Sequence, residues 1–392
     1  MDLHLSNQIH VIGFTPLAKF YAHAIASTPN LSVQILAHHP PARANWDVEG
    51  RRLRLYSRSG QFISSAEISC PEPIADPALR YRGVPLAKQL NNIIIDTETG
   101  AILPTLRNLR HRIDRQTTIC LLHSGLGLVD DINEAIFPDP NERPNFVLGE
   151  STHRVGRISG YGYSVQYRQS GSLYLYGVPR LENTEFALLG MRQSQHLIQM
   201  LATQQSLSVV PLPKARFLWW KIPWLIFSST ADCVSVMLGI KYSQIGPNPY
   251  ARSLMIDLLE EAITIVSKFP ELQVMPHKVE SFLRPQFRRK MRAYLNAQGT
   301  NTSPWIAKVR MGRAPPIDYF NGYLVRRAEE IGIDAKHHRM AVAMVKARVN
   351  ARTWELRTDL LGTTPYMTDT DAIGGGRPAP KPEDYEIDWE EM

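Results

Sequence analysis

Short apolar runs and longer amphipathic stretches alternate along the first part of the chain. Apolar, β-branched runs at 9–13, 31–36, 92–95 and 118–122 predict buried strands, and the stretch at 17–26 predicts a helix after the first of them. Strands that alternate with helices in this way are typical of a parallel sheet with helices on both faces. The pattern therefore predicts a doubly wound α/β domain in the N-terminal half.

The pattern changes after residue 160. Apolar and aromatic residues alternate over 163–167 and again over 173–175, on either side of Ser170-Gly171. Alternation with a period of two, interrupted by a short Ser-Gly turn, is typical of an antiparallel hairpin. We expect this hairpin to close the first domain.

A polar segment with prolines at 203–214 predicts a linker, and the apolar pattern after it is mostly helical. The expected helices span about 217–239, 251–269, 286–295, 317–331 and 336–349. The end of the chain combines glycines, alternating prolines and many acids, a composition typical of disorder. We therefore expect an α/β domain at 1–205, an all-helical domain at 206–360 and a disordered acidic tail at 361–392.

Charge is distributed unevenly along the 392 residues. The formal net charge is +7, but residues 369–392 hold eight acids against Arg377 and Lys381, which leaves +13 for the rest of the chain. Basic residues gather in three clusters, Arg107–Arg115, Arg284–Arg292 and Lys336–Arg348. A body this basic is compatible with two readings, an anionic partner such as RNA or a ribosome, or a solvated basic surface.

Several other classes find no support in the composition. No apolar run approaches the roughly 20 residues that a membrane-spanning helix needs. The three cysteines, Cys70, Cys120 and Cys233, are far apart and predict neither a disulfide framework nor a metal site. The first residues lead almost directly into the strand at Ile9 and show no secretory or Arg-rich targeting pattern.

Short blocks of sequence, in a fixed order, resemble one known family. They are Ile9–Gly13, Ser124–Gly127, Asp131–Glu134, Asn301–Ser303, Gly312-Arg313 and Ile317–Tyr323, of which the last is the most specific. Together they resemble the fungal ketopantoate reductases over about residues 8–350. The resemblance implies a Rossmann-like N-terminal domain, a helical C-terminal domain like that of 6-phosphogluconate dehydrogenase, an active site in the cleft between them, and NADPH as the cofactor.

The chain departs from the family at the dinucleotide loop. A working fingerprint is G-x-G-x-x-G, whose second glycine lets the backbone approach the pyrophosphate. Here Gly13 keeps the first glycine, whereas Thr15 and Ala18 replace the second and third. Pro16 removes one backbone N–H from the helix start, and Thr15 with Pro16 can cap and begin the helix without a ligand. His39 lies where the family places a basic residue for the 2′-phosphate, so we expect a loop that does not bind the cofactor.

The positions that match the family's catalytic residues have changed as well. The resemblance places Glu98 at a lysine, Ser124 at the asparagine of a turn, and Trp224, Ser228 and Asp232 at the lysine and two asparagines of one helix; Ser303 is kept, and Pro316 replaces a glutamate. An indole cannot supply a proton at neutral pH, and a positioned acid contributes about 10²–10⁴ in rate. Lys221 becomes a candidate acid only if the helix register contains a gap. We therefore expect no working catalytic set.

Two functions follow from these observations. The leading hypothesis is a non-catalytic pseudoenzyme associated with RNA or a ribosome. It rests on a similar resemblance, to a fungal mitochondrial translational activator of cytochrome b mRNA, which implies a mitochondrial location and no cofactor. The alternative is an NADP-dependent 2-dehydropantoate 2-reductase or a related reductase.

Overall fold

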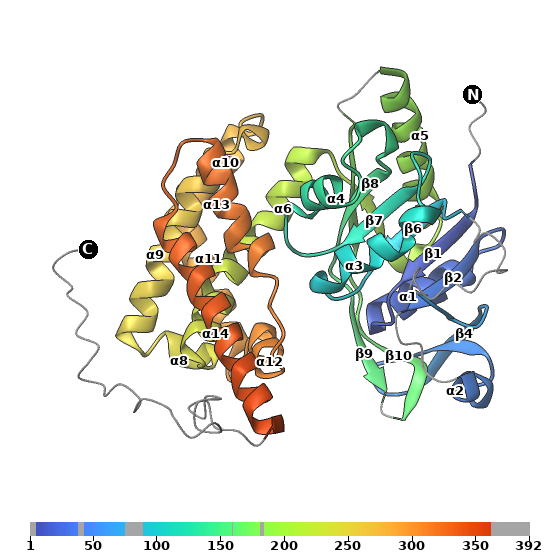
Figure 1. Cartoon of the computed structure of the whole chain (residues 1–392), viewed down its shortest axis with the longest axis horizontal. Helices are drawn as coiled ribbons and strands as arrows, with labels where there is room; N and C mark the ends of the chain where they lie inside the picture. Colours follow the sequence, from blue (N-terminus) through green and yellow to red (C-terminus); the bar gives the residue numbers. More distant parts are fainter. Residues whose placement is uncertain (1–4, 38–42, 75–88, 159, 181–183, 362–392) are drawn as a thin grey trace, which may run out of the picture.

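The structure is a computed structural model that describes residues 5–37, 43–74, 89–158, 160–180 and 184–361. It consists of a sheet domain and a helical domain that lie side by side (Figure 1). The turn that contains His39 and the acidic tail at 362–392 both lie outside the described residues. No helix of the described part is both long and apolar enough to cross a membrane.

The main sheet of the first domain has eight strands in the order β12-β11-β8-β7-β6-β1-β2-β5. Their bounds are β1 Gln8–Ile12, β2 Ser32–Ala37, β5 Glu72–Pro73, β6 Asn92–Ile95, β7 Thr118–Leu122, β8 Asn145–Ser151, β11 Leu173–Val178 and β12 Val209–Pro211. Neighbours from β8 to β5 run parallel, and β11 runs antiparallel to β8. This arrangement confirms the doubly wound α/β fold expected from the sequence.

Helices cover both faces of the main sheet. Helices α1 (Pro16–Ala26) and α5 (Thr184–Ala202) pack on one face, through apolar residues such as Phe20 and Leu197. Helices α3 (Thr99–Leu109) and α4 (Leu128–Ala135) pack on the other, through residues such as Leu106 and Ile132. The central strands β1 and β6 are buried on both sides and are mostly apolar, although His10 and Asn92 are buried within them.

A second, four-stranded sheet lies over α1 and was not expected. Its order is β4-β3-β10-β9, with bounds β3 Arg52–Tyr56, β4 Phe62–Glu67, β9 Arg154–Ile158 and β10 Tyr161–Gln169, and the short helix α2 (Arg43–Val48) precedes it. Leu53, Tyr163 and Val165 of this sheet are buried in the same core as α1. The second sheet thus covers the face of α1 that points away from the main sheet.

The hairpin expected around Ser170-Gly171 is wrong. The strand before it, β10, pairs with β9 and β3 in the small sheet, whereas β11 after it pairs with β8 in the main sheet. The chain changes sheets here because Gly171 lies against the backbone of His153, where an added Cβ would be 2.4 Å from the His153 nitrogen. Local alternation gives each strand its buried face but does not say which strand is its partner.

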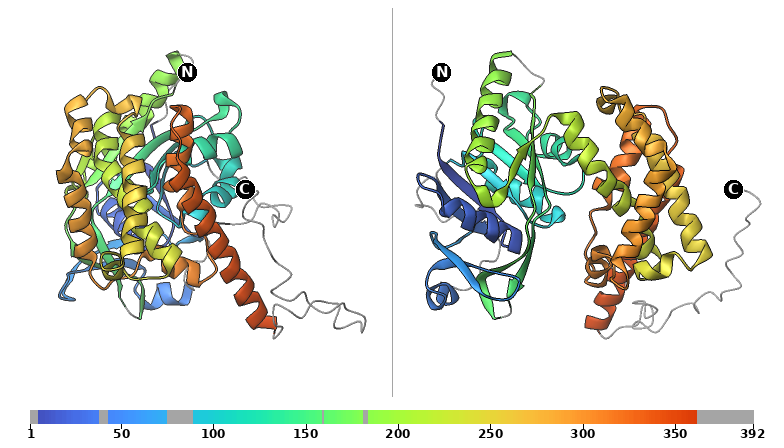
Figure 2. Two further views of the ribbon diagram at one scale, coloured as in Figure 1. Left: turned by 90° about the vertical axis from the view of Figure 1, so that its left-hand side faces the viewer. Right: turned by 180° about the vertical axis from the view of Figure 1, so that it is seen from behind.

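The second domain is all helical among its described residues and has its own core. Its helices are α6 Lys214–Phe227, α7 Cys233–Leu238, α8 Tyr242–Ile245, α9 Pro249–Val266, α10 Pro276–Leu283, α11 Pro285–Gln298, α12 Pro304–Arg310, α13 Asn321–Glu330 and α14 Lys336–Leu361. Helix α6 leaves the sheet domain and enters the helical domain, as the view from behind shows (Figure 2). The main sheet extends to Pro211 through β12, beyond the expected domain boundary after residue 205.

Candidate functional site

The turn after β1 needs a glycine for reasons of backbone geometry alone. Gly13 has φ +120°, a conformation that residues with a Cβ rarely adopt, and an added Cβ would lie 2.1 Å from the carbonyl oxygen of Asp96. The Gly13 nitrogen also donates to the carbonyl of Leu36 at 2.9 Å. The first glycine of the fingerprint is therefore explained by the crossing of three chain segments, without a ligand.

The N-terminus of α1 is closed by side chains of the protein itself. Thr15 is the N-cap, and its hydroxyl accepts a hydrogen bond from the Ala18 nitrogen at 3.0 Å. The same hydroxyl donates to the carboxylate of Asp96, which directly follows β6. Burial raises the pKa of Asp96, and the hydrogen bonds from Thr15 and the Ala18 backbone act in the opposite direction. Asp96 thus places an acidic group at the N-terminal end of α1, where the positive end of the helix dipole would otherwise attract a phosphate.

These residues do not fit a dinucleotide. A pyrophosphate beside Asp96 would meet a carboxyl group in a partly desolvated site, and like charges at short range are unfavourable there. Pro16 supplies no backbone N–H, and the Thr15 side chain occupies the space that a second glycine leaves free. Ala18 is fully buried and packs in the core. Asp96 has no counterpart among the residues singled out from the sequence.

An open cavity of about 670 Å³ nevertheless lies beside this helix end. Thr15, Pro16 and Asp96 line one side of it, and Arg58, Arg154 and Arg168 of the small sheet contribute cationic side chains. All three arginines are exposed. The cavity could accept an anion through these arginines even though the helix end itself carries a carboxyl group.

Lys221 is the buried cation between the two domains. It lies on α6, is 1% exposed, and its ammonium donates to the carbonyl oxygen of His123 at the end of β7. It also forms an ion pair with Glu150 of β8, with the Nζ–Oε2 distance at 3.2 Å. Burial lowers the pKa of Lys221, and the charge of Glu150 partly offsets that shift. The lysine is therefore held by two groups of the sheet domain.

The turn beside Lys221 is His123-Ser124-Gly125. The ring nitrogen Nδ1 of His123 accepts from the Gly125 nitrogen at 2.8 Å, and burial together with Lys221 lowers the His123 pKa to about 3. Ser124 is exposed and lies 3.5 Å from Glu150, measured from Oγ to Oε1. The turn thus presents a neutral imidazole and a hydroxyl next to an already paired lysine.

Helix α6 places Trp224 and Lys221 in different surroundings. Trp224, matched from the sequence to the family's lysine, has its ring stacked on Tyr294 of the helical domain at 5.3 Å and 3°. Lys221, three positions earlier, donates to the His123 carbonyl next to Ser124. After α6 the helix continues as a π-helical segment, Ser228–Asp232, which contains an extra residue per turn. The match of the family's lysine to Trp224, with Lys221 as the alternative, stays a prediction.

Three further expected positions form a buried network inside the helical domain. Asp232 accepts a hydrogen bond from the Tyr242 hydroxyl, and hydrogen bonds from Ser228 and Ser303 also act on its carboxyl group. Burial raises the Asp232 pKa despite these hydrogen bonds. Ser303 in addition caps α12 by accepting from the Trp305 nitrogen at 3.1 Å. These side chains satisfy one another and support the packing of the helices.

Glu98 and Pro316 lie where the two domains meet or close to it. Glu98 precedes α3 and forms an exposed ion pair with Arg313, with the Oε1–Nη1 distance at 3.6 Å. Pro316 begins the short 3₁₀ turn Ile317–Tyr319, whose last carbonyl accepts from the Leu126 nitrogen at 2.9 Å. Both positions connect the domains and present no free acid or base to a cleft.

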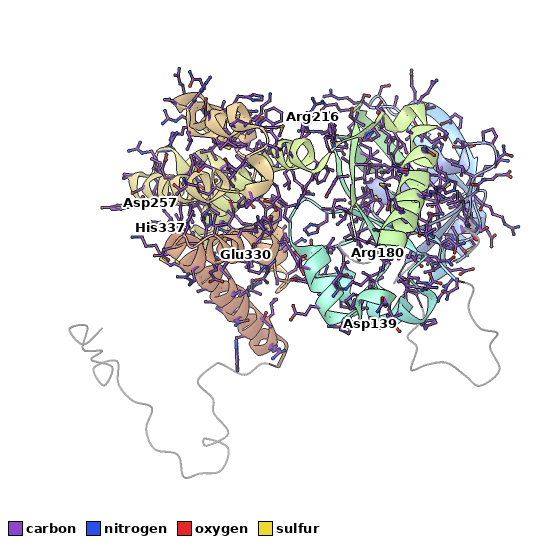
Figure 3. All side chains as sticks on the ribbon, turned by 90° about the horizontal axis from the view of Figure 1, so that it is seen from above. Asp139, Arg180, Arg216, Asp257, Glu330 and His337 are labelled. Atoms are coloured by element: carbon purple, nitrogen blue, oxygen red, sulfur yellow. The ribbon has the colours of Figure 1, made fainter. Side chains whose placement is uncertain are left out.

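A smaller cavity of about 300 Å³ lies between the domains. His123, Gly125 and Asp130 line its sheet side, and Arg326 and Glu330 line its helical side. Figure 3 labels Glu330 on the side of the helical domain that faces the sheet domain. Positive and negative side chains share the lining, so the cavity does not present the uniformly cationic surface that an anionic keto acid favours.

The geometry assigns the chain to a class: a two-domain protein with a doubly wound sheet, a helical second domain and a lysine at the junction. Two sequence profiles identify the family. "Ketopantoate reductase PanE/ApbA" matches residues 9–177, and "Ketopantoate reductase PanE/ApbA C terminal" matches residues 216–349. The chain belongs to the ketopantoate reductase family.

Individual relatives are distant. The "Probable 2-dehydropantoate 2-reductase" of Schizosaccharomyces pombe is 18% identical over 349 residues, which cover 88% of this chain and 97% of the relative. A crystal structure of the Bacillus subtilis protein of the same description has a TM-score of 0.58 at 16% identity, covering 87% and 99% of the two chains. A ternary structure of D-mandelate dehydrogenase with NADH has a TM-score of 0.57 at 16% identity, covering 88% and 99%. At these identities the likeness to solved structures concerns the fold.

The structure adds two residues that the sequence comparison missed. Asp96 accepts a hydrogen bond from Thr15 of the altered loop, and Glu150 forms an ion pair with Lys221. Neither lies in a recognisable motif: Asp96 is the residue after β6, and Glu150 is one of seven residues of β8. Only the position immediately after a parallel strand, where ligand-binding residues gather, could have drawn attention to Asp96.

Proposed function

We propose that this chain is a non-catalytic member of the ketopantoate reductase family that acts as an RNA- or ribosome-associated factor in mitochondria, similar to a translational activator. The loss of catalysis is supported by the closure of the α1 end by Thr15 and Asp96. The RNA or ribosome partner is supported by the basic body of the chain, which has a net charge of +13 outside the acidic end.

Loss of the reductase chemistry is supported by the charges around Lys221. A keto acid and NADPH are both anionic, and the family chemistry needs a cation that can hold a substrate and release a proton. In this chain Glu150 already forms an ion pair with Lys221, and the carbonyl oxygen of His123 accepts a hydrogen bond from the Lys221 ammonium. An incoming carboxylate would have to separate a buried ion pair, which is costly.

The test of this half is a fluorescence titration of the full chain with NADPH. We expect no saturable binding at millimolar NADPH, and a micromolar dissociation constant would refute the proposal. A matched variant, Asp96→Ser, removes the carboxyl group at the α1 end but keeps a hydrogen-bonding side chain. Weak binding that emerges only in this variant would identify Asp96 as the blocking group.

The partner half is tested by sedimentation. We expect the chain to be found in mitochondria and to co-sediment with mitochondrial ribosomes at low salt, and to dissociate as salt is raised, because phosphate contacts release counterions. A chain that stays at the top of the gradient at every salt concentration, and that leaves RNA unretained, would contradict this half.

A reductase is the second candidate, favoured by two specific observations. Lys221 reaches the Ser124 turn, as a family acid would, and three arginines line the cavity beside α1. In this reading NADP binds through Arg58, Arg154 and Arg168 instead of the helix end. NADPH-dependent reduction of 2-dehydropantoate that is abolished by Lys221→Met, together with tight NADPH binding, would establish it.

A further inference from the structure

The structure separates the three basic clusters by how their charges are used. In Lys336–Arg348, most cations are bound internally. Arg339 pairs with two acids, Lys346 pairs with Asp318 at 2.7 Å, and Arg348 donates to the Met237 carbonyl at 2.7 Å. This cluster stabilises α14 and offers few charges to a partner.

The cluster Arg107–Arg115 is also engaged. Arg110 pairs with Glu142 and lies over the ring of Phe137, with its guanidinium carbon 4.6 Å from the ring centroid. Arg112 and Arg115 have partners as well. Only the exposed Arg107 stands apart, so this cluster does not form a continuous cationic surface.

The cluster Arg284–Arg292, on α11, is different. Arg284 pairs with Glu280 at 3.6 Å and Arg288 pairs with Glu260. Arg289, Lys290 and Arg292 are exposed, and within the described part of the chain none of the three is found in an ion pair. Helix α11, whose sequence is PQFRRKMRAYLNAQ, contains no acidic residue. This helix therefore carries three available positive charges, spread around its exposed side.

An aromatic groove of about 330 Å³ lies beside Lys290, which is one of its lining residues. It is lined by residues of α6, α10 and α11: Trp219, Trp220, Pro223, Trp224, Ser281, Phe282, Gln286, Phe287, Lys290 and Tyr294. The rings are held in place by other rings. Trp224 stacks on Tyr294 at 5.3 Å, and Trp220 stacks on Tyr174 of β11 at 4.4 Å.

Part of these rings remains open to solvent. Trp220 is 39% exposed and Trp224 is 36% exposed. The ammonium of Lys278 lies 4.4 Å from the ring of Trp219, and that of Lys290 lies 5.5 Å from the ring of Tyr294. Fixed, half-exposed rings between lysines combine a stacking surface with positive charge.

We propose that this groove, which we call the aromatic groove, binds single-stranded RNA, with bases stacked on Trp220 and Trp224 and phosphates on Lys278 and Lys290. The inference rests on the proposed RNA-associated function and locates its binding surface. Base stacking on aromatic side chains next to a cationic track is how single strands are held without sequence-specific readout.

Charge and composition favour RNA over a protein partner. A groove for an amphipathic helix is lined mainly by flexible aliphatic side chains, whereas Pro223 is the only aliphatic residue that lines this one. The charged side chains at its rings are Lys278 and Lys290, which repel a basic surface such as that of a second copy of this chain. A polyanion with flat bases matches both properties.

The experiment measures fluorescence anisotropy of a short labelled single-stranded RNA of mixed sequence with the full chain. We expect Trp224→Leu to weaken binding by about 5- to 150-fold, because one stacked base is lost. Trp224→Phe should retain most of the affinity, since a stacking ring remains. Quenching of tryptophan fluorescence on binding should accompany the anisotropy change in the original chain.

An exposed charge at the groove provides a second variant that leaves the packing intact. Lys290→Gln should weaken binding and lower the slope of log affinity against log salt by about 0.7 for the lost phosphate contact. Arg107→Gln, on the sheet domain, is the charge control, and Trp354→Leu, on α14 and 69% exposed, is the tryptophan control. Both controls should bind as the original chain does.

The outcomes are distinguishable. RNA binding that is unaffected by the Trp224 and Lys290 variants overturns the groove assignment but leaves the proposed function standing. No RNA binding, together with no ribosome co-sedimentation, overturns both. Dimerisation seen by analytical ultracentrifugation and abolished by Trp224→Leu would assign the groove to a second copy of the chain instead.

Discussion

At the scale of single residues, the turn before α1 is closed by its own side chains. Thr15 and Asp96 hydrogen bond to each other at the end of α1, and each has an ordinary structural explanation. Thr15 caps the helix and Asp96 accepts hydrogen bonds from it. The same two side chains occupy the space at the helix end where a pyrophosphate would bind. Under the proposed function, loss of cofactor binding and stability of the loop follow from the same two side chains.

Gly13 provides a prediction at this scale. Gly13→Ala should destabilise the chain by about 1–3 kcal/mol, because a residue with a Cβ is strained at this φ and would collide with the Asp96 carbonyl. Urea denaturation without any cofactor measures the loss. Gly100→Ala, where an added Cβ meets nothing within 4 Å, should be nearly neutral. Equal stability of Gly13→Ala and the original chain would mean that Gly13 is not held by backbone geometry.

At the scale of elements, much of the fold could be predicted and the pairing of strands could not. The apolar runs at Gln8–Ile12, Ser32–Ala37 and Thr118–Leu122 are strands because their burial on both faces leaves a continuous apolar signal. The small sheet was missed because β3 and β9 alternate with arginines and are short. Helix α6 was recognised, but its π-helical continuation was not, because hydrophobic periodicity does not register one extra residue.

The residues of the candidate site could be predicted from the sequence only where they belong to a recognisable motif. The altered loop at Thr15 and the turn at Ser124 were located from the sequence, whereas Glu150 and Asp96 became visible when the strands were brought together. Lys221 lies between these cases. It was recognised as an alternative, but its contacts with His123 and Glu150 depend on how α6 packs against β7 and β8, which the sequence does not show.

Packing of α13 against α14 gives a prediction about pH. His338 is fully buried, accepts a hydrogen bond from Asn321 at 3.0 Å, and burial lowers its pKa to about 3. The unfolded chain binds the proton of this histidine more readily than the folded chain does. The stability that neutral His338 contributes is therefore fully present above about pH 6.5 and is lost as the pH falls from there towards 3. Between pH 7 and 5, His338 should cost about 2 kcal/mol of stability.

The measurement compares urea denaturation at the two pH values. His338→Gln should lower stability at pH 7 but show a smaller loss on acidification, by about the same 2 kcal/mol. His277→Gln, at an exposed position, should retain the pH dependence of the original chain. An unchanged pH dependence in His338→Gln would show that other groups, such as the buried His123, dominate acid sensitivity.

At the scale of the whole molecule, each domain has its own core, and the junction between them combines apolar and charged contacts. Leu126 of the sheet domain is buried in the core of the helical domain, and Tyr319 of the helical domain packs against a core of the sheet domain. Exposed ion pairs such as Glu98–Arg313, and Arg326–Asp131 at 4.0 Å, contribute little individually. The buried Lys221 of α6 pairs with Glu150 of β8 across the same junction.

The pair gives the last prediction. Glu150→Gln should destabilise the chain by about 3–5 kcal/mol, because it leaves the Lys221 charge buried without a counterion. Lys221→Met combined with Glu150→Gln should recover most of that loss, since a buried ion pair can be replaced by uncharged groups of similar size. A double-mutant cycle by urea denaturation measures the coupling, and the exposed pair Arg352–Glu355 serves as the control, with about 0–1 kcal/mol expected. If the double variant is stable and keeps its RNA affinity, Lys221 has a structural role in this chain. A lysine that acted as a catalytic acid would instead show its loss as lost NADPH-dependent turnover.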